Sequence, residues 1–205
     1  MNSLEIFNYS RLKYQIQQKR YEWCSVLDIL AEKKPKKVLE IGCYDGGTTY
    51  SFSHFCETLV TIDDNNPCRF SHDEIKSKCK YDLIIGNSHL EDTFNKVTNI
   101  SSDYDCLFID GDHSYEGTLQ DYTMYSKLVN PNGLIIFHDV VDSPYHRQAG
   151  CYASRAWLEV RGANYKEFIC TDASIENGII NHDVCVPCEL NDPRPTWGGI
   201  GVKLV

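Results

Sequence analysis

Acidic and histidine side chains end several apolar runs in this 205-residue chain. The stretch 104–117 reads YDCLFIDGDHSYEG: its apolar run ends in Asp110, and His113 follows three residues later. The run LIIFHD likewise ends in His138 and Asp139. Carboxylates bind cations, and an imidazole, which titrates near neutral pH, can accept a proton during a reaction. We therefore expect a reacting centre just beyond these runs.

A glycine-rich turn, VLEIGCYDGGTT, occupies residues 38–49. Gly42 and Gly46 let a ligand approach the backbone closely. Glu40 and Asp45 place negative charge where the pyrophosphate of a dinucleotide would meet repulsion, so the turn favours a cationic ligand. A tight turn that binds no ligand is the alternative interpretation.

Asp63 follows Gly42 by about twenty residues, the spacing at which an acid after the second strand of a nucleotide-binding fold binds a ribose diol. Together with the acidic turn, this spacing predicts an adenosyl ligand that carries an ammonium group, as S-adenosylmethionine does. A nicotinamide-dependent oxidoreductase is the alternative enzyme class, and the negative charge of the turn argues against it.

Apolar segments that lack polar alternation predict strands covered on both faces, as in a parallel sheet flanked by helices. Such a sheet binds ligands beyond the carboxyl ends of its strands, which is where the polar residues stand. The expected strands are 36–42, 58–63, 81–86, 105–110, 134–139, 165–170 and 197–205, and the expected helices include 21–34, 46–56, 114–129 and 151–162. We expect one domain over 1–205, with N-terminal helices in 1–34 and a loop or lid in 171–196.

The turn VLEIGCYDGGTT resembles motif I of the class I S-adenosylmethionine-dependent methyltransferases, with Tyr44 in place of the usual middle glycine. FIDGDHSYEG, GLIIFHDVV, SRAWLEV and GIGV resemble the subgroup that includes macrolide sugar O-methyltransferases and cephalosporin-hydroxylase-like proteins. The resemblance spans residues 37–205. It implies an α/β, Rossmann-like, doubly wound and mostly parallel seven-stranded sheet, with an antiparallel last strand and helices on both faces.

The resemblance also implies a cofactor site for S-adenosylmethionine. Asn87 and Ser88 stand at the adenine side, although an aspartate is commoner at the position of Asn87. The cofactor-binding residues implied are Glu40, Gly42, Tyr44, Asp45, Gly46, Asp63, Asn87, Ser88 and Asp110.

The metal-dependent members of the subgroup hold a divalent ion, usually Mg²⁺, at positions that match Asp110, His138 and Asp139, so the resemblance implies a divalent metal with Mg²⁺ as the expected ion. An acidic or amide residue is more usual at the position of His138, and an imidazole favours manganese, iron or zinc, or no tightly bound metal. His113 matches the general base of one subgroup member. The resemblance therefore implies that Asp110 and His113 are catalytic in methyl transfer to a hydroxyl of a small acceptor, with a sugar or glycosylated metabolite expected.

Two alternatives remain open for these residues. Asp112 or Ser114 can cap a helix that begins near Tyr115, which is compatible with a catalytic strand end. A protein that binds an adenosyl ligand or a partner without catalysis would also retain this sheet.

The net charge of -9 disfavours nucleic acid and anionic membrane surfaces as partners. The polar N-terminus and the absence of a long apolar run predict a cytoplasmic protein, and a homo-oligomer stays open. Cysteines in apolar runs predict mostly reduced thiols. His182, Cys185 and Cys188 have zinc-like spacing, but the chain lacks an obvious second pair, so a loop with incidental cysteines is the default.

Overall fold

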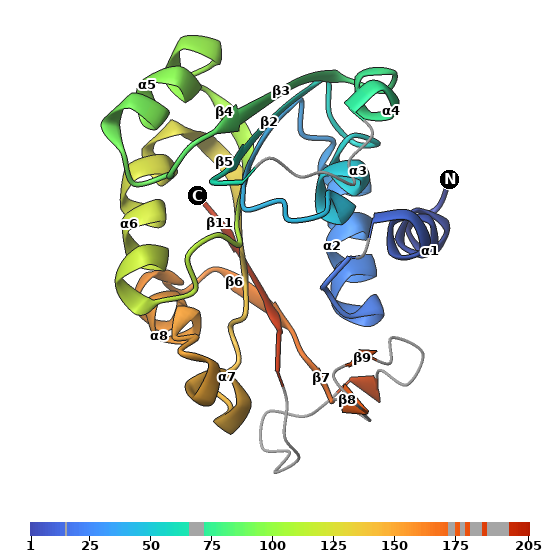
Figure 1. The fold of residues 1–205 in the computed structure, drawn as a ribbon, viewed down its shortest axis with the longest axis vertical. Helices are drawn as coiled ribbons and strands as arrows, with labels where there is room; N and C mark the ends of the chain where they lie inside the picture. The colour runs from blue at the N-terminus through green and yellow to red at the C-terminus, as the bar shows by residue number, and fades with distance from the viewer. Residues whose placement is uncertain (15, 66–71, 172–174, 177–178, 181–185, 188–196) are drawn as a thin grey trace.

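A seven-stranded sheet forms the centre of the molecule in the computed structural model, which describes residues 1–14, 16–65, 72–171, 175–176, 179–180, 186–187 and 197–205 (Figure 1). The strand order is β3-β2-β1-β4-β5-β11-β6, and only β11 runs antiparallel to its neighbours. The predicted Rossmann-like fold is thereby confirmed. The strands are β1 (Lys37–Ile41), β2 (Thr58–Asp63), β3 (Lys80–Ile85), β4 (Tyr104–Ile109), β5 (Val129–His138), β6 (Tyr165–Phe168) and β11 (Ile200–Leu204).

Helices cover both faces of this sheet (Figure 1). One face carries α1 (Ser3–Tyr14), α2 (Arg20–Lys33), α3 (Gly47–Phe52) and α4 (His72–Lys76), and the other carries α5 (Glu91–Ile100), α6 (Tyr115–Tyr125) and α8 (Ala153–Val160). The sequence reasoning had not predicted α4 or α5. Among the described helices, none is long and apolar enough to cross a membrane.

Successive strand residues enter two separate apolar cores, one on each face. Val38 and Phe108 belong to one core, whereas Leu39 and Leu107 belong to the other, and all four side chains are fully buried. Each burial of this kind stabilises the fold by about 1.5–3 kcal/mol. Polar alternation is absent from these strands because neither face meets water.

The region before β5 differs from the sequence expectation. The predicted helix 114–129 is α6 followed by the short 3-10 helix η1 (Ser126–Leu128). Residues 130–133, predicted as a turn, lie within the bounds of β5. Asn132 has a left-handed φ of 65°, and the pairing of β4 with β5 shifts register near the start of both strands. The chain therefore bends there without leaving the sheet.

A short helix, α7 (Pro144–Ala149), follows β5. The Ser143 hydroxyl accepts a hydrogen bond from the His146 backbone N–H at 3.1 Å, and proline suits the first helical position. This helix places the His146 side chain in the interior, where it is almost fully buried.

The expected loop or lid at 171–196 contains several short strand pairs in its described part. β7 (Cys170–Thr171) pairs with β10 (Val186–Pro187), and β8 (Ile175–Glu176) pairs with β9 (Ile179–Ile180). The candidate zinc ligands His182, Cys185 and Cys188 lie outside the described residues.

Free thiols predominate among the cysteines that the structure describes. Cys170 is disulfide-bonded, so the expectation of reduced thiols does not extend to it. The free cysteines are Cys24, Cys43, Cys56, Cys79, Cys106 and Cys151.

A buried ion pair at the start of α2 holds the C-terminal strand in place. Glu22 accepts hydrogen bonds from the backbone N–H groups of Cys170 and Gly199, both at 3.1 Å. Lys19 Nζ lies 3.8 Å from Glu22 Oε1 and donates to the carbonyl oxygens of Cys170 and Trp197. Burial raises the pKa of Glu22 to about 7, although Lys19 opposes the shift.

The buried Glu22 predicts a pH-dependent stability. Its pKa is about 7 in the folded protein against 4.5 as the ordinary value, so the folded state binds more protons between these values. Its contribution to the free energy of unfolding therefore falls as pH rises from about 4.5 to about 7, by up to about 3 kcal/mol. Glu22→Gln should remove this contribution and flatten the profile, measured by urea unfolding at several pH values. An unchanged slope in the variant would contradict the prediction.

Candidate active site

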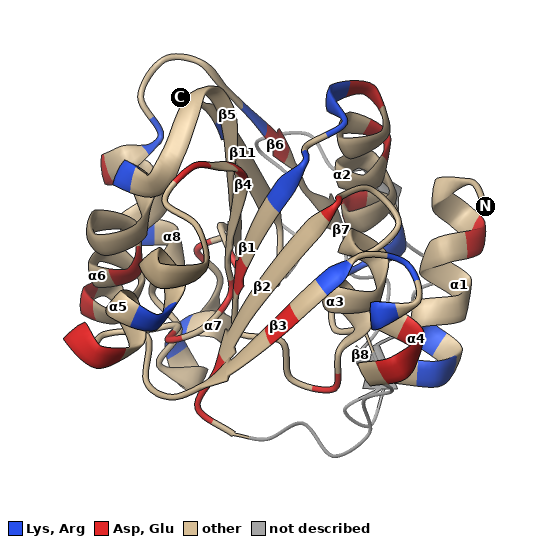
Figure 2. Cartoon of the chain, turned by 90° about the horizontal axis from the view of Figure 1, so that it is seen from above, with Lys and Arg blue, Asp and Glu red and all other residues tan. Residues whose placement is uncertain are grey.

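A cavity of about 920 Å³ opens where the parallel strands end. Lysines begin β1 and β3 at the far edge of the sheet, whereas Asp63 ends β2 beside the cavity (Figure 2). The structure brings nearly all predicted site residues to this cavity. It is lined by Gly42, Tyr44, Asp45, Asp63, Asn87, Ser88, Asp110, His113, His138 and Asp139, among others.

The turn after β1 packs directly against the end of β4. Gly42 has a left-handed φ of 83°, and a Cβ atom there would lie 2.1 Å from the Asp110 carbonyl oxygen. Gly46 has a φ of 84° at the start of α3. Tyr44, which replaces the usual glycine, has a left-handed φ of 48° and an exposed side chain. This backbone explains the preference for glycine, because a side chain adopts it only with strain.

Asp63 holds the same turn from the neighbouring strand. Its Oδ2 accepts hydrogen bonds from the backbone N–H groups of Cys43 at 2.9 Å and Tyr44 at 3.0 Å, while Oδ1 accepts from the N–H of Asn65 at 2.9 Å. Oδ2 already accepts two bonds, but Oδ1 can accept one more, so Asp63 can bind a ribose hydroxyl through Oδ1 while it supports the turn.

Glu40 lies beneath the turn and does not line the cavity. It is fully buried and accepts hydrogen bonds from the hydroxyls of Thr48, Thr49 and Thr61. Burial raises its pKa to about 7, and the three hydroxyls oppose that shift. The predicted cofactor residue Glu40 therefore supports β1 and α3 from within and acts on the cavity through its charge.

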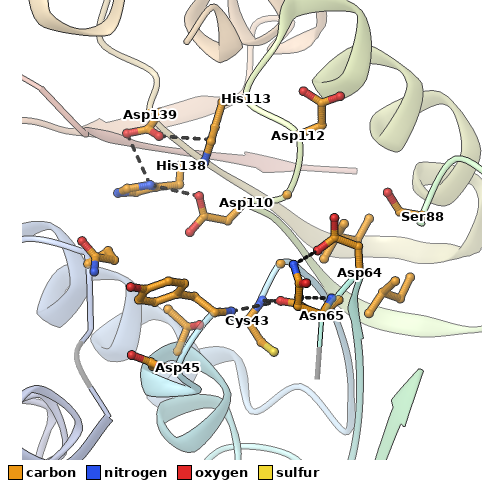
Figure 3. A pocket seen from close by; sticks show the side chains of 18 of the residues that line it. Cys43, Asp45, Asp64, Asn65, Ser88, Asp110, Asp112, His113, His138 and Asp139 are labelled. Carbon is orange, nitrogen blue, oxygen red and sulfur yellow. Dashed lines mark hydrogen bonds and ion pairs between the residues drawn. The ribbon is translucent and has the colours of Figure 1, made fainter. Parts of the chain in front are cut away.

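The ends of β4 and β5 bring together the carboxylates of Asp110 and Asp139 and the imidazoles of His113 and His138 (Figure 3). Asp110 Oδ1 lies 3.1 Å from His138 Nδ1, and Asp110 Oδ2 accepts a hydrogen bond from Gln18 Nε2 at 2.7 Å. His113 Nδ1 lies 3.3 Å from Asp139 Oδ2. Asp139 has a left-handed φ of 57°, a strained backbone conformation of the kind that clusters at functional sites.

Asp139 Oδ1 faces two further imidazoles. His138 Nδ1 lies at 3.4 Å and His146 Nε2 at 3.2 Å. Burial opposes charge on both partners, but Asp110 and Asp139 together raise the pKa of His138 well above its ordinary value. The same attraction outweighs burial at Asp139 and holds the pKa of its carboxyl well below the ordinary range. The centre is thus a buried network of mutually stabilised charges.

The donor set fits a divalent cation. One ligand atom each from Asp110, His138 and Asp139 lie within 4.8 Å of one another. His138 Nε2 and Asp139 Oδ1 are buried, and within the described part of the chain neither atom has a partner at hydrogen-bonding distance and angle. A ligand set of two carboxylates and one imidazole suits manganese, iron or zinc better than Mg²⁺, because Mg²⁺ prefers ligands that are all oxygen.

The loop after β3 adjoins the Asp63 end of the cavity. The Gly86 N–H donates to the Asp63 carbonyl oxygen at 2.8 Å, and Asn87 Oδ1 accepts from the His89 N–H at 2.8 Å. Ser88 lies at the other end of the pocket from His138 and Asp139 (Figure 3). A nucleoside whose ribose binds Asp63 would place its base beside this loop.

The strand-end motif also begins a helix. The Ser114 hydroxyl accepts a hydrogen bond from the Gly117 N–H at 3.0 Å and caps α6. Capping by Ser114 therefore coexists with an Asp110 and a His113 that line the cavity.

Residues 39–140 match the protein family described as a methyltransferase domain. The chain belongs to the class I S-adenosylmethionine-dependent methyltransferases. A curated relative of this methyltransferase, the uncharacterized protein R132 of Acanthamoeba polyphaga mimivirus, is 25% identical over 146 residues, which cover 67% of the chain and 66% of the relative. The match thus spans about two thirds of that relative's length.

Solved structures share the fold of the methyltransferase. The MycE methyltransferase from the mycinamycin biosynthetic pathway, in complex with Mg and SAH, is 15% identical with a TM-score of 0.54, and the match covers 68% of this chain and 40% of MycE. An O-methyltransferase from Bacillus cereus in complex with SAH is 14% identical with a TM-score of 0.64, covering 100% of this chain and 90% of that enzyme. At these identities the likeness concerns the fold.

Several cavity or network residues of the methyltransferase were absent from the sequence-based prediction. Gln18 lies just before the predicted helix 21–34, and no local pattern places it on Asp110. The sequence Ser143-Pro144 indicates a helix start, and this helix carries His146 into the interior. His89 lines the cavity next to Ser88, so its position directly after the predicted adenine-side residues was the available signal.

The turn of the methyltransferase predicts a position-specific cost for an added methyl group. Gly42→Ala combines a left-handed φ with a collision against the Asp110 backbone, and we expect a loss of about 2–5 kcal/mol in the free energy of unfolding. Gly150→Ala is the matched control, because Gly150 has a φ of 74° with nothing within 4 Å. It should cost only about 1–2 kcal/mol. Equal losses in urea unfolding would show that the close approach is relaxed at no cost.

Proposed function

We propose that this protein is an S-adenosylmethionine-dependent O-methyltransferase that acts on a hydroxyl of a small acceptor, with a sugar or glycosylated metabolite as the expected class. The observation that carries the proposal is the position of His113. Among the three imidazoles around Asp139, the side chain of His113 is 48% exposed, whereas those of His138 and His146 are each 4% exposed. His113 is therefore the imidazole that an acceptor can reach.

His113 has the geometry of a general base. Asp139 can only accept a hydrogen bond when ionised, so the neutral His113 ring carries its proton on Nδ1 toward Asp139 Oδ2 and leaves Nε2 free to accept one. In the proposed reaction, Nε2 takes the acceptor's hydroxyl proton while the oxygen forms a bond to the methyl carbon. The carbon–sulfur bond breaks, and its electrons neutralise the sulfonium to give S-adenosylhomocysteine.

The acidic cavity suits the charge of the cofactor. Asp45, Asp63 and Asp110 line it together, and their field favours a ligand that carries an ammonium and a sulfonium group. Asp63 would bind the ribose, and the turn at Gly42 would let the amino acid part lie against the backbone. Holding methyl and acceptor in line supplies much of the acceleration in such reactions, roughly 7–11 kcal/mol in well-oriented models.

One aromatic ring of the cavity lining has a second ring beside it. Trp197 lines the cavity, and its ring centroid lies 6.2 Å from that of Tyr145. Aromatic faces pack well against the C–H faces of sugars and against planar rings, which supports a hydroxylated acceptor of modest size.

A divalent metal, if bound, would be held by Asp110, His138 and Asp139, as the resemblance implies. It would lower the pKa of an acceptor hydroxyl bound to it. Proton removal by His113 and binding of the ribose by Asp63 depend only on residues of this chain.

The second candidate is a non-catalytic protein that binds the adenosyl ligand. One observation favours it: Asp110 accepts a hydrogen bond from Gln18 and lies 3.1 Å from His138, so this one carboxylate has partners within the protein. Turnover with any acceptor would exclude it.

Replacement of His113 tests the reaction. Wild-type protein should bind S-adenosylhomocysteine in calorimetry and release it from S-adenosylmethionine when screened against sugars and catechols. His113→Gln should keep that affinity but lower kcat by about 10²–10⁴-fold, because only proton removal is lost. His72→Gln, at the start of α4 and away from the cavity, is the control and should behave as wild type. No binding heat would refute the cofactor proposal, and binding without any turnover would favour the non-catalytic candidate.

Metal binding is a separate prediction. Protein stripped with EDTA should bind Mn²⁺ more tightly than Mg²⁺ in calorimetric titrations, because His138 supplies an imidazole where Mg²⁺ prefers oxygen. Asp139→Asn should weaken both, since it removes a charged ligand. Binding of neither ion, or tighter binding of Mg²⁺, would contradict this assignment.

A further inference from the structure

A buried carboxylate that the proposed reaction does not use lies next to the end of the cavity that Ser88 and His89 line. Asp121, on α6, is fully buried, and its Oδ2 would lie 3.4 Å from a Cβ atom built on Gly111. Gly111 lines the cavity, whereas Asp121 does not. The Asp121 carboxylate therefore lies directly behind Gly111, a lining residue that has no side chain.

Two side chains of the loop after β3 connect Asp121 to the cavity. His89 Nε2 lies 3.4 Å from Asp121 Oδ1, and both Ser88 and His89 line the cavity. Burial raises the pKa of Asp121 to about 6, and hydrogen bonding from Ser88 with the charge of His89 opposes the shift. Neither oxygen of Asp121 makes a hydrogen bond of full geometry within the described residues, so the carboxylate attracts any donor these neighbours offer.

The carboxylate fixes where the protons of its neighbours lie. An ionised Asp121 has only acceptors, so it draws the Ser88 hydroxyl proton toward itself. It likewise favours the His89 tautomer with the proton on Nε2, which leaves Nδ1 as an acceptor. The lone pairs of Ser88 and His89, rather than their protons, then remain for a ligand.

We propose that Asp121 is a positioning residue that makes this end of the cavity an acceptor of hydrogen bonds, and thereby selects a purine with an exocyclic amino group over one with an oxo group. The inference rests on the proposed function, which places an adenosyl cofactor in the cavity. Asp63 would bind its ribose, and the backbone bond from Gly86 to Asp63 sets the base beside Ser88 and His89. Adenine offers an amino donor at this place, whereas hypoxanthine offers a carbonyl acceptor that would face like lone pairs.

The test compares S-adenosylhomocysteine with S-inosylhomocysteine, whose base carries an oxo group in place of the amino group and a proton on the adjacent ring nitrogen N1. Wild-type protein should prefer the adenosyl compound by about tenfold or more in calorimetry, the consequence of one unmatched polar contact. Asp121→Asn keeps the side-chain size but adds an amide donor, so Ser88 or His89 can turn a proton toward the ligand. The preference should then fall by about tenfold.

Tyr125→Phe is the matched control. The Tyr125 hydroxyl donates to the Ser88 carbonyl oxygen at 2.7 Å, so its loss loosens the same loop without changing the proton positions. Both compounds should weaken by a similar factor, and their ratio should stay at the wild-type value.

The outcomes separate this inference from the proposed function. Tight binding of both compounds with an unchanged ratio in Asp121→Asn would overturn the inference alone. Absence of binding by the wild-type protein would overturn the proposed function and the inference with it. Should Asp121→Asn fail to fold, Ser88→Ala decides, because removal of this acceptor must weaken the adenosyl compound more than the inosyl compound. Equal weakening there would overturn the inference.

Discussion

The close approach of the turn after β1 to the end of β4 is the constraint on which the site depends. The Asp110 N–H donates to the Ile41 carbonyl oxygen at 2.9 Å, and Gly42 then passes against the Asp110 backbone with no room for a side chain. Because the two strands are parallel neighbours, the cofactor turn and the acid that begins the reacting centre meet at one edge of the sheet. Cofactor and acceptor are thereby brought to adjacent positions by backbone pairing alone.

The acidic side chains of this site differ in how deeply they are buried, and their depth decides what each one can contact. Glu40 and Asp121 lie behind the cavity wall and act through the groups that they hold, whereas Asp45 and Asp63 line the cavity itself. Asp139 occupies an intermediate place, since its left-handed backbone turns it toward three imidazoles at once. The neighbouring His138 keeps the Asp139 carboxylate charged, and that charge in turn orients the accessible His113.

The sequence predicted the order and character of the central strands because each is a short apolar run bounded by polar residues, and it predicted their meeting edge because parallel strands end together. It did not predict α7, since only Ser143 and Pro144 mark its start. Nor did it predict α4 or α5. For α5 a signal was present and was not used, because Phe94, Val97 and Ile100 recur at three-residue spacing and pack against the core.

The sequence by itself determined the fold class, the family and the residues at the strand ends, because these depend on local periodicity and on motifs within a few residues of one another. The tertiary structure alone decided that Gln18 binds Asp110, that His146 lies against Asp139 and that Asp121 lies behind Gly111. These contacts join segments that local patterns do not relate. Which side chain satisfies a buried carboxylate is settled only when the helices pack on the sheet, since burial makes an unpaired carboxylate costly and sequence spacing does not specify the partner.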